Sequence, residues 1–405
     1  MKKTLLIVSG GIEAADAIRR AKEMDLHVVV SDCNPDAPGF AIADDHILAS
    51  VYDVRESVTA AERYALEIRP IDGVICVAAD APVTVAAIAE RLGLPGIPMA
   101  AAKLACDKLA MKRRFRAAGV AVPWFAAVES ANALARIVAE RGSDLVLKPV
   151  DSRGSRGVQR LAKVGDFDTA FALARSHSPT ARVMIEDYLD GPQVSTESIV
   201  IDGQCFTPGF SDRNYEFLDR YAPFFIENGG DLPSILPEPV QAGVKAVVAR
   251  AAAALGIVDG TVKGDIVVHD GAPFVIELAA RLSGGFFCTR EIPLNTGVDF
   301  IGAAIKVALG ERVDPAALEP ERRAPVAQRY AFPRPGRVIA VKGVDAARAL
   351  PGIAEIVVTA RPGDIIPRAG DKRPSAAMVL ATGRVRADAV RAAEAALACI
   401  EIETR

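Results

Sequence analysis

Two carboxylates on neighbouring apolar segments give the strongest chemical signal in this sequence. Asp265 lies in Gly264-Asp265-Ile266, and Glu277 lies in Val275-Ile276-Glu277-Leu278. The residues between them, His269-Asp270-Gly271-Ala272, are typical of a hairpin turn, so two paired antiparallel strands would place the carboxylates side by side. Such acids repel each other unless a cation lies between them. Oxygen ligands of this type favour Mg²⁺ or Mn²⁺, with substrate phosphates completing the octahedron; the alternative is a surface salt-bridge network with Arg281.

A lysine near the end of an apolar strand is the second signal. Val146-Leu147-Lys148-Pro149-Val150 runs directly into the Gly- and Ser-containing segment Asp151-Ser152-Arg153-Gly154-Ser155-Arg156-Gly157. An ammonium group beside the backbone N–H groups of such a loop can surround phosphate oxygens. The loop is not of the Walker A type, because Gly-Lys-Ser/Thr occurs nowhere in the chain. The alternative is an exposed hairpin with a surface lysine, although charges are rare inside apolar strands without a partner.

Two further segments carry weaker signals. The strand that begins at Val183 ends in the carboxylates Glu186 and Asp187 and then becomes irregular, which suits the edge of an adenine ring. A strand-to-turn junction with solvated acids is the alternative there. Segment 211–230 interleaves aromatic residues with Arg and Asp. Such a stretch can line a small-molecule pocket, or it can be a packed surface loop.

Composition indicates an ordered protein of several domains. The chain has 405 residues, of which 51% are apolar and 24% charged, with a net charge of −3. This length suggests two to four domains and excludes extended disorder. The charge balance gives no support for nucleic-acid binding, since the short basic clusters at 112–116 and 322–323 are typical of solvated surface.

We expect a cytoplasmic protein with free thiols. No apolar run approaches the ~20 residues of a membrane-spanning helix. The apolar stretch after Met1-Lys2-Lys3 lasts only from Leu5 to Val8, shorter than the ~7–15 residues of a signal-peptide core. The six cysteines contain no C-x-x-C pair, which favours reduced and mostly buried thiols over disulfides or a zinc site. Four lone histidines also argue against a His-rich metal centre.

The elements that must position these residues follow a clear order along the chain. Strands and helices alternate over residues 1–95, which predicts a doubly wound parallel sheet. The breakers in 94–98 mark a boundary, and one helix is expected over 100–118. A small α/β unit follows over 122–186, then strands near 194–201 and 204–210, an irregular stretch 211–235, a helix 237–255, and strands near 262–269 and 273–279. Region 325–405 is predicted to be a separate α/β tail, with strands near 337–342, 354–359 and 377–382 and a helix over 386–399.

Taken in this order, the features resemble the ATP-grasp superfamily of carboxylate ligases, which includes biotin carboxylase, carbamoyl-phosphate synthetase and the L-amino acid ligases. The resemblance implies an α/β ATP-grasp fold with an N-terminal doubly wound (pre-ATP-grasp) domain and a small C-terminal α/β domain. We therefore divide the chain into residues 1–98, an ATP-grasp domain over 99–315 with a lid subdomain at about 122–186, and residues 316–405. Glu277-x-x-x-Arg281 running into Ser283-Gly284-Gly285 is similar to the branch that contains the L-amino acid ligases.

The resemblance also implies a nucleotide site. Lys108 and Lys148 match lysines that contact ATP phosphates, and the 152–157 loop matches the flap that closes on them. The further nucleotide-binding positions that we expect are Gly154, Ser155, Gly157, Glu186, Asp187, Leu189 and Gln193. Within this set, Glu186 would face the adenine amino group, Leu189 would supply main-chain contacts and Gln193 would accept from the ribose.

The implied metal ligands are Asp265 and Glu277, and the implied catalytic residues are Lys148 and Arg281, which stabilise the phosphoryl group. Many family members have Asn two residues after the second carboxylate, where this chain has Ala279. One metal ligand is then missing or replaced by water.

The implied activity is ADP-forming ligation with ATP and Mg²⁺ (or Mn²⁺), in which a substrate carboxylate becomes an acyl-phosphate and an amine displaces phosphate. The expected partners are a small-molecule carboxylate and amine, without nucleic acid or membrane, and a homodimer is an open expectation because dimers are common among relatives. Two alternatives stay open. One is a bicarbonate-activating carboxylase of the biotin-carboxylase or aminoimidazole-ribonucleotide type, and the other is a nucleotide-binding scaffold without catalysis. Segments 211–230 and 283–290 are our candidates for the wall that sets substrate specificity.

Overall fold

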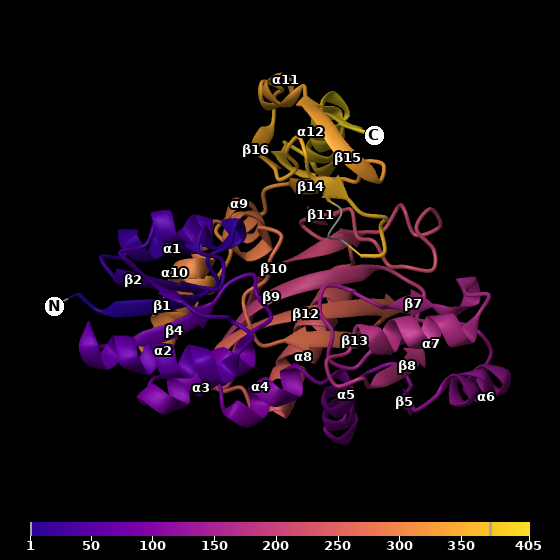
Figure 1. The fold of residues 1–405 in the computed structure, drawn as a ribbon, viewed down its shortest axis with the longest axis horizontal. Coiled ribbons are helices and arrows are strands. Elements are labelled where there is room, and N and C mark those ends of the chain that lie inside the picture. The colour runs from indigo at the N-terminus through magenta and orange to yellow at the C-terminus, as the bar shows by residue number, and fades with distance from the viewer. Residues whose placement is uncertain (1, 372–374) are drawn as a thin grey trace.

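The computed structural model describes residues 2–371 and 375–405 of the chain. A parallel four-stranded sheet of order β3-β2-β1-β4 forms its N-terminal part, on the left of Figure 1. Its strands are β1 (Thr4–Val8), β2 (His27–Asp32), β3 (Asp45–Leu48) and β4 (Gly73–Cys76). The helices on its two faces are α1 (Ala15–Glu23), α2 (Val54–Glu67), α3 (Pro82–Leu92) and α10 (Phe300–Ala308).

Burial on both faces explains the continuous apolar run of β1. Leu5 and Ile7 pack with Ile18 of α1 and with α10, whereas Leu6 and Val8 pack with residues of α2 and α3. The predicted doubly wound arrangement is therefore confirmed. The position of α10 was not predicted, because this helix returns to the sheet from more than 200 residues further along the chain.

The next part is a small antiparallel sheet of order β5-β8-β6-β7, which we call the lid. It consists of β5 (Phe125–Val128), β6 (Leu145–Pro149), β7 (Gln159–Arg160) and β8 (Val183–Asp187), with α6 (Ala131–Arg141) and α7 (Phe167–Ser176). Ser130 and Asp166 cap the two helices by accepting hydrogen bonds from backbone N–H groups of their first turns. Both helices pack on the sheet around a core of their own that includes Leu134 and Leu147.

Two short helices lead into the lid where one helix was predicted over 100–118. They are α4 (Met99–Ala105) and α5 (Lys108–Ala117). The break lies at Cys106-Asp107, where the Asp107 side chain accepts from Ala110 N and so starts a new helix. This break places Lys108 at the first turn of α5.

The centre of the molecule is an eight-stranded sheet of order β13-β12-β9-β10-β11-β14-β18-β16. Its strands are β9 (Gln193–Ile201), β10 (Gln204–Asn214), β11 (Gly229–Leu232), β12 (Gly260–His269), β13 (Ala272–Ala279), β14 (Val326–Ala331), β16 (Ile353–Val358) and β18 (Ala377–Thr382). The apolar helix α8 (Glu238–Leu255) packs on β12 and β13 through Val244, Val248 and their neighbours. The π-helix Phe287–Glu291 and α9 (Ile292–Thr296) connect β13 to α10.

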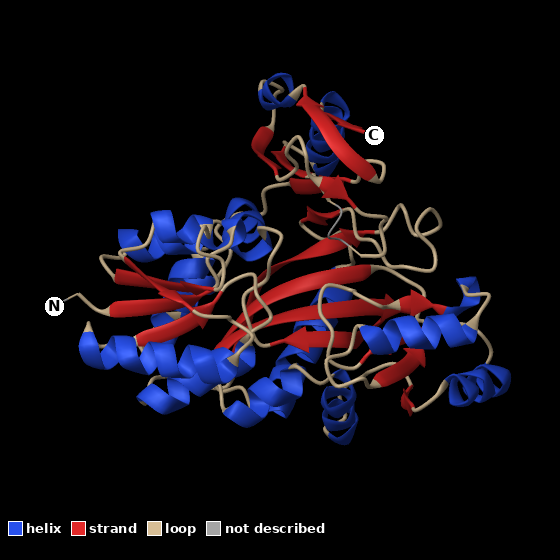
Figure 2. Cartoon of the chain, viewed as in Figure 1, coloured by secondary structure: helices blue, strands red, loops and turns tan. Residues whose placement is uncertain are grey.

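The C-terminal tail differs from the separate unit that we expected, because three of its strands extend the central sheet. β14, β16 and β18 continue that sheet beyond β11, and α12 (Arg386–Cys399) packs against them (Figure 2). The remaining elements are α11 (Val344–Arg348) and a small sheet of β15 (Gly336–Lys342), β17 (Ile365–Ile366) and β19 (Glu401–Thr404). β14 connects these strands to the central sheet because it pairs with both β11 and β18. This strand was not predicted from the sequence.

All six cysteines are free thiols, as predicted. The expectation of mostly buried thiols is wrong, because only Cys76 and Cys288 are buried and Cys33 and Cys399 are exposed. Among the described residues, no helix combines the length and apolar character needed to cross a membrane.

Candidate active site

Asp265 and Glu277 are directly opposite each other on β12 and β13, which confirms the predicted pairing. A β-bulge follows Asp265 and locally shifts the register of the two strands. Both side chains line two adjoining cavities. The packing of α8 against these strands holds the two carboxylates at a fixed position in the sheet.

Basic groups neutralise both carboxylates. Asp265 Oδ1 accepts from Arg213 Nη1 at 2.7 Å, from Ser195 Oγ at 3.3 Å and from Lys263 Nζ. Glu277 Oε1 lies 3.1 Å from Lys108 Nζ. Burial by itself would raise the pKa of Asp265, but the charges of Arg213 and Lys263 hold it well below its usual range. Asp265 is therefore ionised at neutral pH.

Lys148 belongs to a buried cluster of two lysines and one glutamate. Glu186 Oε1 accepts from Lys148 Nζ, and Glu186 Oε2 lies 2.8 Å from Lys112 Nζ. Burial would raise the pKa of Glu186, yet the two ammonium groups lower it below its usual value. Glu186 itself lines the first of the two cavities, so the expectation that it faces the adenine amino group stays a prediction. Of the two lysines that hold its carboxylate, Lys148 lines this cavity and Lys112 does not.

The loop over 152–157 takes backbone conformations that few residues adopt. Gly154, Ser155 and Gly157 all have positive φ, at 61°, 58° and 74°, and for the non-glycine Ser155 this is strained. Lys108 Nζ donates to Ser152 O at 2.6 Å and so ties the loop to α5. The guanidinium of Arg153 lies 3.9 Å from the ring centroid of Tyr52 in the N-terminal part. The loop thus bridges the lid and the N-terminal sheet.

The first cavity, with a volume of about 120 Å³, lies between the lid and the central sheet. Of the expected nucleotide positions, those that line it are Lys108, Lys148, Gly154, Ser155, Glu186, Asp187, Leu189 and Gln193. Gly157 lies outside this lining and sits at the base of the loop, where a Cβ would come within 3.1 Å of Pro149 and His177. Tyr215 and Phe225 add aromatic surface to this cavity. Segment 211–230 therefore lines a pocket, one of the two alternatives that its sequence left open.

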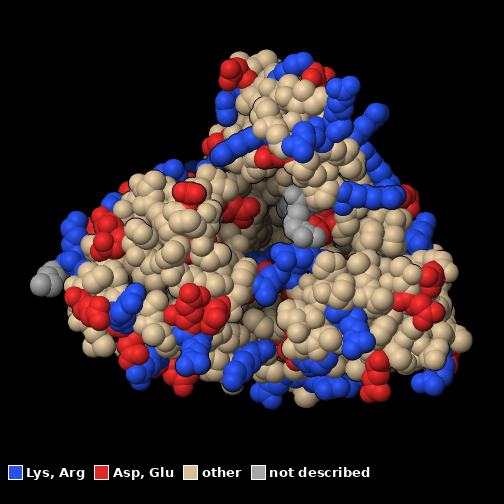
Figure 3. All heavy atoms as spheres, in the orientation of Figure 1, with Lys and Arg blue, Asp and Glu red and all other residues tan. Residues whose placement is uncertain are grey.

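The second cavity, of about 430 Å³, continues from the first toward the N-terminal and C-terminal parts. Figure 3 shows a hollow at the centre of the face that is turned toward the viewer, with Lys and Arg side chains gathered at the lower rim of the hollow. Both segments proposed for the specificity wall contribute to it, through Glu227 and Gly230 on one side and 283–285 with Phe287 on the other. Glu13, Glu291, Gln328 and Tyr330 complete its far end. The cavity therefore contains groups of both charge signs.

Arg281 lines this second cavity and is fixed from the N-terminal part. Its Nε and Nη2 atoms each lie 2.6 Å from Asp80 Oδ1. The backbone beside it pairs with the end of β4, because Val77 and Leu282 form a parallel bridge. Burial would lower the pKa of Arg281, but Asp80 raises it well above the usual value, so the side chain stays charged.

Several residues of the site were not predicted. Arg213, Lys263 and Asp80 reach it from β10, β12 and the loop after β4. Glu197, on β9, is 0% exposed, and its Oε1 accepts from Ser283 N at 2.9 Å. A local signal existed for Lys263, which stands two residues before Asp265 on the same strand and hence on the same face. The other three depend on contacts between distant segments.

Comparison with known families decides the assignment. Residues 105–285 match the ATP-grasp domain, and residues 329–405 match the L-amino acid ligase C-terminal domain 2. The chain carries an ATP-grasp domain, followed by an L-amino acid ligase C-terminal domain 2. The first match covers the lid, the loop over 152–157, both carboxylates and Arg281. The second covers most of the tail that extends the central sheet.

Individual relatives agree with this assignment. An uncharacterised protein y4rH of Sinorhizobium fredii is 27% identical to this chain over 398 residues, which is 96% of this chain and 80% of the relative. A D-alanine–D-alanine ligase of Acidovorax ebreus is 27% identical over 243 residues, 57% of this chain and 71% of the relative. Among solved structures, L-amino acid ligase from Bacillus licheniformis has the same fold, with a TM-score of 0.83 at 20% identity over 100% of this chain and 99% of that one.

ATP binding is inherent to this fold, and the donor set also suits a divalent ion. Two carboxylates paired across β12 and β13, those of Asp265 and Glu277, offer oxygen ligands at the junction of the two cavities. Over residues 2–371 and 375–405, no group of three or more His, Cys, Asp or Glu side chains is arranged to hold a metal by itself. Substrate phosphates and water would therefore have to complete the coordination, which is typical of Mg²⁺.

Proposed function

We propose that this enzyme activates the carboxylate of one amino acid as an acyl-phosphate and joins it to the amine of a second, releasing ADP and phosphate. The observation that carries the proposal is the position of Asp265 and Glu277. They lie where the cavity on the lid side meets the larger cavity beyond it. The residues that line both cavities are Arg153, Gly154, Ser155, Arg213, Phe225, Asp265 and Glu277.

In this assignment the first cavity receives ATP. Lys148 and Lys108 would contact its phosphates, and Asp187, Leu189 and Gln193 would surround the nucleoside end. When bound, ATP supplies the phosphoryl group, and a divalent ion held by Asp265 and Glu277 supplies positive charge to its oxygens. The remaining catalysis is positioning and charge stabilisation by residues of the chain.

The second cavity would hold the two amino acids. Arg281 and Lys263 offer positive charge in this cavity, and Glu13 and Glu227 offer negative charge. A zwitterion carries one carboxylate and one ammonium group, so a cavity with both signs suits it. The relatives named as D-alanine–D-alanine ligases and the match of the tail to an L-amino acid ligase domain support the same substrate class.

The 152–157 loop would protect the reaction from water. It lines both cavities through Arg153, Gly154 and Ser155, and an acyl-phosphate exposed to water would hydrolyse. Arg213, between Asp265 and Glu227, would meet the negative charge that develops as phosphate leaves.

The function is tested by measuring ADP formation with ATP and Mg²⁺ in a matrix of amino acids. Each reaction is run with one amino acid, with pairs, and with bicarbonate plus an amine. We expect ADP and phosphate in equal amounts with at least one amino acid or pair, together with a peptide product identified by mass. Turnover that requires bicarbonate would instead indicate a carboxylase. Nucleotide binding without ADP formation under all conditions would indicate a scaffold.

A further inference from the structure

Four positions on β12 and β13 form a rectangle on one face of the central sheet. Lys263 pairs with Ala279, and Asp265 pairs with Glu277. Residues two apart on a strand share a face, and directly paired residues of neighbouring strands point to the same side. All four line the second cavity. Three corners of the rectangle therefore carry a charged group, and the fourth carries a methyl group.

The ammonium of Lys263 is fixed on one oxygen of the metal-binding pair. Its Nζ bonds Asp265 Oδ1, the atom that also accepts from Arg213 Nη1 at 2.7 Å and from Ser195 Oγ at 3.3 Å. The side chain of Lys263 is 15% exposed. Within the described part of the chain, the hydrogen bonds to the Asp265 carboxylate all go to Oδ1, so Oδ2 is available to an ion held together with Glu277.

Because residue 279 is alanine, the fourth corner of the rectangle lacks the oxygen ligand that a second ion would need. Two-ion sites hold their ions about 3.5–4 Å apart, and each ion requires its own oxygen ligands. Ala279 offers no side-chain oxygen, and its strand partner Lys263 is a cation. A second divalent ion at this end of the rectangle would be repelled by Lys263 and Arg213, the two cations that bind Asp265 Oδ1. No additional carboxylate or amide is present there to offset this repulsion.

We propose that this enzyme binds a single divalent ion with its nucleotide, and that the ammonium of Lys263 supplies the positive charge of a second ion. The inference rests on the proposed nucleotide site. Lys263 lines the second cavity but not the first, so its charge faces the transferred phosphoryl group from the amino-acid side. An ammonium group is suited to this role because it is a compact point charge with three donors.

The test counts Mn²⁺ bound to the full-length chain by equilibrium dialysis with saturating adenylyl imidodiphosphate, corrected for Mn²⁺ bound to nucleotide alone. We expect one Mn²⁺ per chain in the wild type, in Lys263→Met and in Ala279→Asn. The double variant Lys263→Met/Ala279→Asn should bind two, and its electron paramagnetic resonance spectrum should show coupling between the ions. Lys342→Met, which removes a surface lysine paired with Glu403, should behave as wild type.

Two Mn²⁺ in the wild type or in Ala279→Asn alone would overturn the inference, because the ammonium would then not exclude the second ion. So would a double variant that binds nucleotide with normal affinity but only one Mn²⁺. These results leave the ligase assignment intact. A wild-type chain that binds neither nucleotide nor Mn²⁺ would overturn the proposed function together with the inference.

Discussion

Lys148 and Lys112 both neutralise Glu186, but only Lys148 faces the first cavity. We therefore propose that Lys148 contacts phosphate, whereas Lys112 forms a structural ion pair. Lys148→Met should lower kcat/KM on the order of 10²-fold or more, the scale seen when one group that stabilises transition-state charge is removed. Lys112→Met should cost far less activity, because Glu186 keeps one lysine and the cavity keeps its ammonium. Steady-state kinetics with melting curves for both variants checks this, and equal losses of activity would contradict it.

Glu277→Ala should abolish ATP-dependent turnover and leave the fold intact. The side chain lies at the cavity junction beside Lys108, and the strand that carries it is held by α8. Circular dichroism and ADP formation are measured on the same preparation, with the surface variant Glu140→Gln as the control. Full activity of folded Glu277→Ala would remove the metal assignment.

Glu197 predicts a pH dependence of stability. Burial raises the pKa of this carboxyl from 4.5 to about 7. Because the folded state holds the proton more tightly, the associated stability is fully present below pH 4.5 and is lost as the pH rises through about 7. Glu197→Gln should therefore match the wild type near pH 4.5 and melt at a higher temperature than the wild type at pH 8. A constant difference in melting temperature across this range would contradict the raised pKa.

Among single residues, the sequence predicted those whose role follows from the residues next to them in the chain. Asp265 and Glu277 could be paired because a short turn separates two apolar strands. The role of Lys263 was missed, although it lies on the same strand as Asp265. Arg213 and Asp80 approach from segments about 50 and 200 residues away from their partners Asp265 and Arg281, and nothing in the local pattern fixes such contacts.

Among the elements, the 152–157 loop gives the clearest prediction. A cation–π contact at an exposed site contributes about 0.5–1 kcal/mol, so the stacking of Arg153 on Tyr52 should modestly stabilise the loop in the conformation that the structure has. Tyr52→Ala should weaken binding of adenylyl imidodiphosphate about two- to fivefold and speed trypsin cleavage within the loop. Tyr52→Phe, which keeps the aromatic ring, is the matched control. Unchanged cleavage in Tyr52→Ala would show that the contact does not restrain the loop.

Elements with a regular apolar period were predicted well, and those defined by distant partners were not. The strand at 377–382 and the helix at 386–399 were predicted with the bounds that the structure has. β14 was not recognised, because its strand character depends on pairing with β11 and β18. The break between α4 and α5 was not predicted because both segments consist of good helix formers and only the cap at Asp107 separates them.

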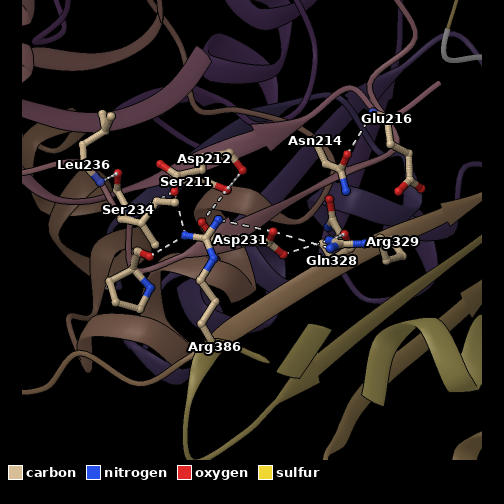
Figure 4. Close-up of polar contacts among 12 residues, drawn as sticks. Ser211, Asp212, Asn214, Glu216, Asp231, Ser234, Leu236, Gln328, Arg329 and Arg386 are labelled. Atoms are coloured by element: carbon tan, nitrogen blue, oxygen red, sulfur yellow. Dashed lines mark hydrogen bonds and ion pairs between the residues drawn. The ribbon is translucent and has the colours of Figure 1, made fainter. Parts of the chain in front are cut away.

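For the whole molecule, the junction between the central sheet and the tail depends on a polar cluster. Arg386, at the start of α12, points from the tail toward Asp212 and Asp231 of β10 and β11 (Figure 4). Its Nη1 lies 2.6 Å from Asp212 Oδ2 and 2.8 Å from Pro233 O. Arg329 of β14 binds Asp231 from the other side at 2.8 Å. The tail is thus joined to the strand that carries Arg213.

Arg386→Ala should destabilise the protein by about 1.5–3 kcal/mol, the usual contribution of hydrogen bonds to charged groups. Arg391→Ala, five residues further along α12, removes a pair with 69% of the arginine side chain exposed and should cost about 0–1 kcal/mol. Urea unfolding of the two variants checks the difference. Equal midpoints would contradict a stabilising role for the cluster.

The central claim is that a carboxylate attacks the phosphoryl group of ATP at the junction of the two cavities. The most direct measurement uses an amino acid whose carboxylate is labelled with ¹⁸O, together with ATP, Mg²⁺ and an amine that supports turnover. Acyl-phosphate chemistry predicts one ¹⁸O atom in the released phosphate for each peptide formed. Phosphate free of ¹⁸O, with peptide formed at the same rate, would contradict the account.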